Sequence, residues 1–221
     1  MPSTSPAALD PNPPRDCPLC PRLVTFREEA RHLHPDWFNA PVPNWGDPDP
    51  KLIIVGLAPG LRGANRTGRP FTGDYAGDTL YDALLRHGLA TGEYRADPGD
   101  GLMLKGVLIA NGVHCVPPEN KPTTTEIRTC RRYLEAAFAR YSGVRGFLAL
   151  GRIAHDQLLA ALGERRARYP FGHGAEHRLT DGRHLFDSYH CSRYNTNTGV
   201  LTVEMFDAVI ARAARFIAEA S

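Results

Sequence analysis

Short apolar runs alternate along the chain with longer segments whose apolar residues recur at helical spacing. Runs of this length, bounded by glycine and polar residues, are typical of β-strands. The first three runs are almost continuously apolar, which indicates a parallel sheet covered on both faces. The predicted strands are KLIIVGL (51–57), GVLIANGV (106–113), VRGFLALG (144–151) and HLFDSYH (184–190).

The segments between and after these runs predict helices, several of them marked by capping residues. Thr123 and Glu126 have capping-box spacing, and Thr202 is the expected N-cap of the last helix. Helices that connect successive parallel strands cover both faces of a sheet. The pattern therefore predicts an α/β fold, a three-layer α/β/α sandwich with a central four-stranded parallel sheet. The predicted helices cover residues 78–88, 124–141, 152–163 and 202–220.

The length and the composition narrow the class of protein. A chain of 221 residues suits one domain, which we place at residues 16–221. Residues 1–15 are polar and rich in proline, which predicts a disordered tail without the apolar region of a secretory signal. No apolar stretch approaches the roughly 20 residues that span a bilayer, so we expect a soluble, intracellular protein with no membrane partner. We further expect a cytoplasmic monomer, associated with the nucleoid if the source is a prokaryote. A net charge of +2 does not by itself indicate a nucleic-acid partner.

Four of the five cysteines are candidate metal ligands. Cys17 and Cys20 form a C-x2-C pair, whereas Cys115 and Cys130 stand far along the chain, with fourteen residues between them. Thiolates favour zinc, copper or iron–sulfur clusters. Zinc ribbons usually use two short knuckles, so this spacing fits an iron–sulfur cluster slightly better. Four unrelated buried thiols are the alternative.

The segment GLAPGLRGANRTGRPFTGD follows the first predicted strand, where ligands bind in open α/β sheets. It matches neither the Walker loop nor the dinucleotide fingerprint. Glycines allow close backbone approach, Arg62, Arg66 and Arg69 suit phosphates, and the ring of Phe71 suits stacking on a base. The loop thus favours a nucleotide outside a duplex, with a long solvated loop and a buried aromatic anchor as the alternative.

Three motifs together resemble a known family. GLAPG…NRTGRPFTGD, NGVHCVPPENKPT and SYHCSRYNTNTG occur in this order beside the four cysteines. The combination resembles the iron–sulfur uracil-DNA glycosylases, specifically their family 5. The resemblance implies a 4Fe–4S cluster bound by Cys17, Cys20, Cys115 and Cys130, and it implies DNA that contains uracil or related damaged bases as the partner.

The resemblance also assigns residues to the base. Phe71 matches the aromatic residue that stacks on the flipped pyrimidine. Asn111 stands where the related family 4 enzymes place the asparagine that reads the uracil edge, whereas many family 5 members have a small apolar residue there. This amide implies a tighter preference for uracil; a structural amide at the end of the strand is the alternative. The implied base-binding residues are Gly56, Leu57, Ala58, Phe71, Asn111 and His190.

The implied catalytic residues are His190, Asp74 and Asn120. His190 matches the histidine that donates to uracil O2 as the base departs, a form of oxyanion stabilisation. Asp74 is expected near the sugar, with helix capping as its alternative, and Asn120 is as well explained by a turn beside the prolines. Leu57 and Ala58 cannot accept a proton, so water activation must come from elsewhere in the site.

The three motifs offer no obvious lysine nucleophile for strand cleavage. Cys191 is expected to be a free thiol. Lys105 and Lys121 lie only at the margins of the motifs, so we expect a monofunctional enzyme that leaves an abasic site uncut. A non-catalytic, metal-stapled DNA-binding protein is the main alternative, and a zinc nuclease is disfavoured by the shortage of clustered carboxylates. The expected DNA-contacting residues are Arg62, Asn65, Arg66, Arg69, Ser192, Arg193 and Asn195.

Overall fold

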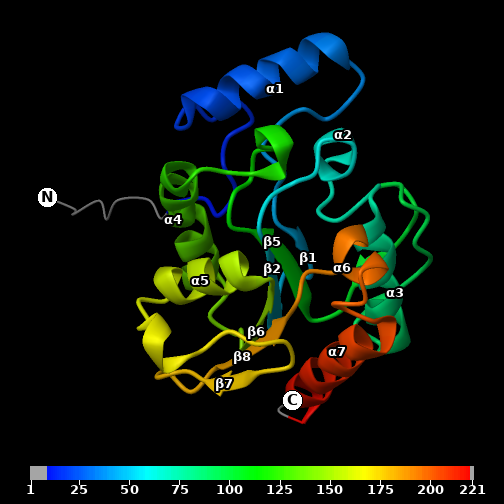
Figure 1. Cartoon of the computed structure of the whole chain (residues 1–221), viewed down its shortest axis with the longest axis vertical. Coiled ribbons are helices and arrows are strands. Elements are labelled where there is room, and N and C mark those ends of the chain that lie inside the picture. The colour runs from blue at the N-terminus through cyan, green and yellow to red at the C-terminus, as the bar shows by residue number, and fades with distance from the viewer. Residues whose placement is uncertain (1–8, 220–221) are drawn as a thin grey trace, which may run out of the picture.

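The structure, a computed structural model, describes residues 9–219 and consists of a twisted central sheet between layers of helices (Figure 1). The helices are α1 Pro21–Leu33, α2 Ala64–Thr67, α3 Tyr75–Arg86, η1 Pro118–Asn120, α4 Thr124–Arg140, α5 Arg152–Ala161, η2 Arg166–Arg168, α6 Arg193–Asn197 and α7 Val203–Ala218. The strands are β1 Trp45–Gly46, β2 Leu52–Gly56, β3 Ala90–Thr91, β4 Met103–Leu104, β5 Val107–Asn111, β6 Gly146–Leu150, β7 Glu176–Arg178 and β8 His184–Ser188.

The four predicted strands form the parallel centre of the sheet, as β5, β2, β6 and β8. The sheet has six strands rather than four, in the order β1-β5-β2-β6-β8-β7. The two additional strands pair antiparallel at the edges, and each has only two or three residues. Strands this short carry no readable alternation of apolar and polar residues, which is why the sequence pattern missed them.

Successive residues of β2 face opposite layers, as the two-residue period of a strand requires. Leu52 and Ile54 pack in one apolar cluster with α3 and α7, while Ile53 and Val55 pack in another with α4 and α5. All four side chains are fully buried. In Figure 1 the α4–α5 pair and the α3–α7 pair lie on opposite sides of the sheet. The three-layer α/β/α prediction is confirmed.

The beginning of the described chain is packed against the domain rather than forming a tail. Pro11 and Pro13 are buried. The Asn44 amide N–H donates to Asn12 Oδ1 at 2.7 Å, and Asn44 Nδ2 donates to the carbonyl of Pro11 at 3.1 Å. The predicted disordered tail was therefore wrong for residues 9–15, and its remainder, residues 1–8, lies outside the described residues. Helix α1 was also unpredicted.

The helix termini largely follow the capping residues seen in the sequence. Thr123 and Glu126 form a reciprocal capping box, and Thr202 accepts from the Met205 N–H. Helix α3 begins at Tyr75 instead of Asp78, since Asp74 is its N-cap. Among residues 9–219, no helix combines the length and the apolar character that crossing a membrane requires.

The capping box predicts a measurable contribution to stability. Replacing Thr123 with Ala should lower the free energy of unfolding by about 1 kcal/mol, because the Glu126 N–H loses its side-chain acceptor. Urea denaturation of the two proteins would measure the difference. Thr125→Ala is the matched control, since Thr125 is exposed in the first turn and outside the capping box; an equal loss in both variants would contradict the assignment.

Candidate active site

A cavity of about 670 Å³ opens at the edge of the sheet where β2 and β5 end and where the chain leaves β8. Carboxyl ends of parallel strands meet at one edge, so motifs far apart in sequence converge here. The structure brings together most of the predicted base-binding and catalytic residues. Lining residues include Leu57, Ala58, Gly60, Arg62, Phe71, Asp74, Asn111, Asn120, His190, Ser192 and Arg193.

Gly56 ends β2 and allows two functional side chains to approach the strand. A Cβ at this position would lie 2.6 Å from Asn111 Oδ1 and 2.9 Å from Phe71 Cζ, too close for either group to stay in place. Gly56 thus acts by leaving room, and it does not line the cavity itself. Its predicted role in binding the base is indirect.

Phe71 and Asn111 supply complementary chemistry to the cavity. The Phe71 ring is 8% exposed and its backbone adopts φ 52°, a left-handed conformation unusual for a bulky residue. Asn111 is 4% exposed, and its side-chain amide has no hydrogen-bond partner within residues 9–219. Because buried amides are normally paired, its donor and acceptor are available to a ligand in the cavity.

His190 lies beside Phe71 on the same wall, with their rings stacked at a centroid distance of 6.0 Å and an interplanar angle of 28°. Burial lowers the pKa of His190 below 6.5, and the negative charge of Asp74 partly opposes that shift. The imidazole is therefore neutral at pH 7 and able to donate one hydrogen bond. Asn195 Nδ2 donates to the His190 carbonyl at 2.8 Å, which fixes the backbone that carries the ring.

Asp74 combines the two roles that the sequence left open. One carboxylate oxygen, Oδ1, accepts from the Gly77 N–H at 3.1 Å and caps α3. The other, Oδ2, lies against the glycine loop, only 2.4 Å from where a Cβ of Gly63 would stand. The carboxylate therefore lines the cavity. Asn120 lies at the exposed rim with φ 56°, at the end of the short helix η1.

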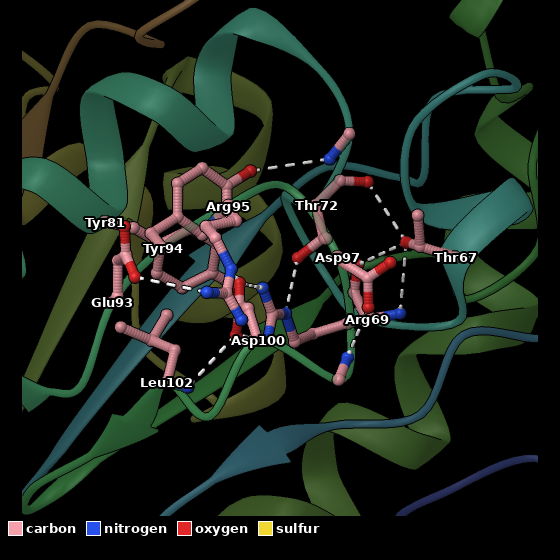
Figure 2. Close-up of polar contacts among 12 residues, drawn as sticks. Thr67, Arg69, Thr72, Tyr81, Glu93, Tyr94, Arg95, Asp97, Asp100 and Leu102 are labelled. Atoms are coloured by element: carbon pink, nitrogen blue, oxygen red, sulfur yellow. Dashed lines mark hydrogen bonds and ion pairs between the residues drawn. The ribbon is translucent and has the colours of Figure 1, made fainter.

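Arg69 was predicted to contact DNA, and this prediction was wrong. Its side chain is 3% exposed and forms two hydrogen bonds of 2.8 Å with the carboxylate of Asp100 (Figure 2). Its guanidinium also stacks with the rings of Trp45, Tyr81 and Tyr94 at 5.0 to 5.6 Å. Asp100 lies 31 residues from Arg69 in the sequence, so no local pattern could reveal this ion pair.

Two other predicted DNA contacts are also occupied within the protein. Asn65 is 1% exposed, and its Nδ2 donates to Asn39 Oδ1 at 2.9 Å. The side-chain amide of Asn195 donates to the backbone carbonyl of His190, as described above. Four predicted contacts remain at the surface or the cavity: Arg62, Arg66 and Arg193 are exposed, and half-buried Ser192 caps α6.

The four predicted ligand cysteines line one small second cavity. Arg27, the His114 N–H and the Tyr133 hydroxyl lie within 3.9 Å of the sulfurs of Cys115, Cys130 and Cys17 respectively. Burial raises the pKa of the Cys115 thiol to about 11 and that of Cys130 to about 12. Among the described residues, no group of three or more His, Cys, Asp or Glu side chains is arranged to hold a metal ion.

Comparison with known proteins identifies the family. The model of the uracil DNA glycosylase superfamily matches residues 43–214. A Type-5 uracil-DNA glycosylase of Thermus thermophilus is 49% identical over 205 residues, which cover 90% of this chain and 93% of that protein. Proteins with the same description from Mycobacterium leprae and Pyrobaculum aerophilum are 44% and 38% identical, over 87% and 90% of this chain and 88% of each relative. This chain belongs to the uracil-DNA glycosylase superfamily.

In this member of the superfamily, the turn after β2 connects the two cavities. Leu57 and Ala58 line the larger cavity and also pack against the apolar cluster that contains Cys17 and Cys130. Neither side chain can exchange a proton, as expected from the sequence. The fifth cysteine, Cys191, is a free buried thiol whose Sγ donates to the Ala76 carbonyl at 3.4 Å.

Sequence reasoning missed one residue beside the larger cavity. Tyr194 on α6 follows Arg193, a cavity-lining residue, and its side chain is 74% exposed. An aromatic side chain this exposed buries little apolar area in the folded protein, so packing does not explain it. The signal in the sequence is the position of Tyr194 within the SRYN motif.

The interaction between Asp74 and His190 predicts a shift that NMR can measure. Replacing Asp74 with Asn should lower the pKa of His190 further, because the carboxylate is the group that favours the charged imidazole. A pH titration of the imidazole C–H resonances would give both pKa values. Asp78→Asn, which removes another carboxylate from α3, is the control and should change the pKa less. A midpoint above 6.5 in the parent, or no change in Asp74→Asn, would contradict the geometry.

Proposed function

We propose that this protein is a monofunctional DNA glycosylase of base-excision repair, which hydrolyses the N-glycosidic bond of uracil extruded from DNA. The observation that carries the proposal is the convergence of Phe71, Asn111 and neutral His190 on one cavity. An aromatic face, a free amide and a hydrogen-bond donor match the three chemical features of uracil: a flat ring, a polar edge and a carbonyl that gains charge on departure. Extrusion of the base is how enzymes of this class gain access to it.

Recognition of the base uses the ring of Phe71 and the amide of Asn111. Stacking on an aromatic side chain holds any extruded base and contributes about 1–3 kcal/mol. The side-chain amide pairs with two groups of uracil at once: its NH2 donates to uracil O4, and its carbonyl oxygen accepts from uracil N3–H. Cytosine presents the opposite pattern at this edge. Asn111 therefore supplies a preference for uracil that stacking cannot provide.

Departure of the base leaves negative charge on uracil O2, and His190 donates a hydrogen bond to that oxygen. A neutral imidazole gives this donor without the cost of burying a full positive charge. The Asn195 bond to the His190 carbonyl holds the backbone that carries the ring before substrate binds. Such preorganised donors usually make the largest single contribution to catalysis.

The sugar becomes cationic as the bond breaks, and the carboxylate of Asp74 stabilises that charge. Asp74 is also the group best placed to orient the attacking water, since Leu57 and Ala58 offer no acceptor. Asn120, which lines the cavity at its exposed rim, contributes a second polar group. The reaction path is largely dissociative. Electrostatic stabilisation of the cationic sugar takes the place of a proton-accepting residue at positions 57 and 58, directly after β2.

The DNA strand lies across the rim of the cavity, where the exposed arginines Arg62, Arg66 and Arg193 neutralise phosphates. Tyr194 occupies the space that the extruded base leaves in the duplex, because an exposed aromatic ring beside the cavity compensates for lost stacking. No lysine lines the cavity among the described residues, so the enzyme forms no Schiff base and leaves the strand uncut.

The four cysteines Cys17, Cys20, Cys115 and Cys130 hold a 4Fe–4S cluster in this proposal. Four thiols line this one cavity, and thiolates are the donors that iron–sulfur clusters take in proteins. The cluster would supply a cross-link between the N-terminal segment, the end of β5 and α4.

The substrate range, the oligomeric state and the cellular location complete the proposed function. Other deaminated or modified bases are further substrates, to the extent that the Asn111 amide tolerates their edges. The protein acts as a monomer in the cytoplasm, at the nucleoid if its source is a prokaryote. A non-catalytic protein that binds uracil or abasic DNA is the second candidate, favoured by the apolar pair Leu57 and Ala58 next to the base.

Excision assays separate the two candidates. The parent should release uracil from a uracil-containing duplex, and the product should break only after alkali treatment. His190→Ala should lower the single-turnover rate roughly 100- to 1,000-fold, the effect typical of one lost oxyanion donor. Asp74→Asn should lower it as well. His32→Ala, at an exposed position on α1, is the control and should match the parent.

The binding alternative predicts a different result. In that case the parent, His190→Ala and Asp74→Asn would bind the duplex equally and none would release uracil. Breakage of the strand without alkali would instead contradict the monofunctional mechanism.

The cluster proposal predicts a visible absorption band in the purified parent. Cys130→Ser should lose the band and should also lower the melting temperature, because one ligand of the cross-link is removed. Cys191→Ser is the matched control, since Cys191 lies outside the cysteine cavity, and it should keep the band. Retention of the full band in Cys130→Ser, together with equal iron content, would remove Cys130 from the ligand set.

A further inference from the structure

The loop that presents Phe71 to the cavity adopts a conformation that needs support from its surroundings. Phe71 has φ 52°, in the left-handed region where a bulky side chain is disfavoured. A conformation of this kind is strained and persists only when neighbouring groups fix it. The groups that fix it determine where the Phe71 ring stands.

The Phe71 backbone is fixed directly by Tyr94. The Tyr94 hydroxyl donates to the Phe71 carbonyl at 3.3 Å and accepts from the Gly73 N–H at 3.4 Å, so it bridges both sides of the turn. Burial raises the pKa of Tyr94 to about 12, which keeps the hydroxyl protonated as a donor. Gly77 makes the contact possible, since a Cβ there would stand 1.7 Å from the Phe71 carbonyl oxygen.

Tyr94 is in turn held by the buried Arg69–Asp100 pair. The Arg69 guanidinium lies 5.6 Å from the centre of the Tyr94 ring, and its Nε donates to Thr72 Oγ1 at 2.7 Å. Asp100 also accepts from the N–H groups of Arg95 and Leu102 at 3.0 Å. The pair thereby joins the segment that carries Tyr94 to the loop that carries Phe71 (Figure 2).

We propose that Tyr94, held in place by the Arg69–Asp100 pair, is a positioning residue that sets the Phe71 ring for stacking on the extruded base. Tyr94 does not line the cavity, so it acts through the turn at residues 71–73 that its hydroxyl bridges. The inference rests on the proposed function, because it concerns the ring that binds the base. It assigns Arg69, the arginine of the GRPF segment, a structural role inside the protein, whereas the sequence predicted a contact with DNA.

The test is a double-mutant cycle between Tyr94 and Phe71. Tyr94→Phe removes the hydroxyl and keeps the ring against Arg69. Phe71→Leu removes the ring that is positioned, and the double variant combines both changes. Tyr169→Phe is the matched control, because it also removes one tyrosine hydrogen bond, to Glu164 at 3.1 Å, away from the cavity.

The expected result is a non-additive cycle in single-turnover uracil excision. Tyr94→Phe should lower the rate roughly three- to tenfold, the effect of one neutral hydrogen bond. In the Phe71→Leu background the same change should have no further effect, since there is no ring to position. Tyr169→Phe should match the parent. Two effects that multiply, or a fully active Tyr94→Phe, would overturn the proposal.

Hydrogen–deuterium exchange tests the same proposal without any activity. Amides of residues 69–77 should exchange faster in Tyr94→Phe than in the parent, while Tyr169→Phe should leave this segment unchanged. Unchanged exchange in Tyr94→Phe would overturn the positioning role. If the parent released no uracil, the proposed function would fail, and the exchange experiment would still decide whether Tyr94 orders the Phe71 loop.

Discussion

The site depends on one geometric constraint, the parallel pairing of β5, β2, β6 and β8. Parallel strands place all their carboxyl ends at one edge, so every loop that leaves these ends meets the others. The end of β2 leads into the glycine loop, β5 ends at Asn111, and β8 leads to His190 two residues beyond its end. Three motifs widely separated in sequence become neighbours for this reason alone.

The glycine loop divides its arginines between two functions. Arg62 and Arg66 are exposed, whereas Arg69 is buried with Asp100 among three aromatic rings. A buried charge is tolerated only when a partner of opposite charge and hydrogen bonds compensate for lost water. The Arg69–Asp100 pair meets this condition, because the guanidinium makes two hydrogen bonds to the carboxylate and a third to Thr72 Oγ1.

The turn after β2 makes the base-binding cavity and the cysteine cavity structurally dependent on each other. Leu57 and Ala58 form part of one wall of the first cavity and pack against the second. Bulky apolar contact here transmits a displacement from either side, because closely packed interiors have little free space. The proposed cluster at the cysteines would therefore hold this wall of the base-binding cavity from a position away from the reacting atoms.

The sequence was sufficient to predict the α/β/α class, the four parallel strands and the capping box at Thr123, because these follow from local periodicity and short-range hydrogen bonds. It also singled out Phe71, Asn111 and His190 as side chains of one site. The burial of Arg69 against Asp100 and of Asn65 against Asn39 became apparent only from the tertiary structure. Exposure and pairing over such separations depend on how distant segments pack, and no local pattern encodes them.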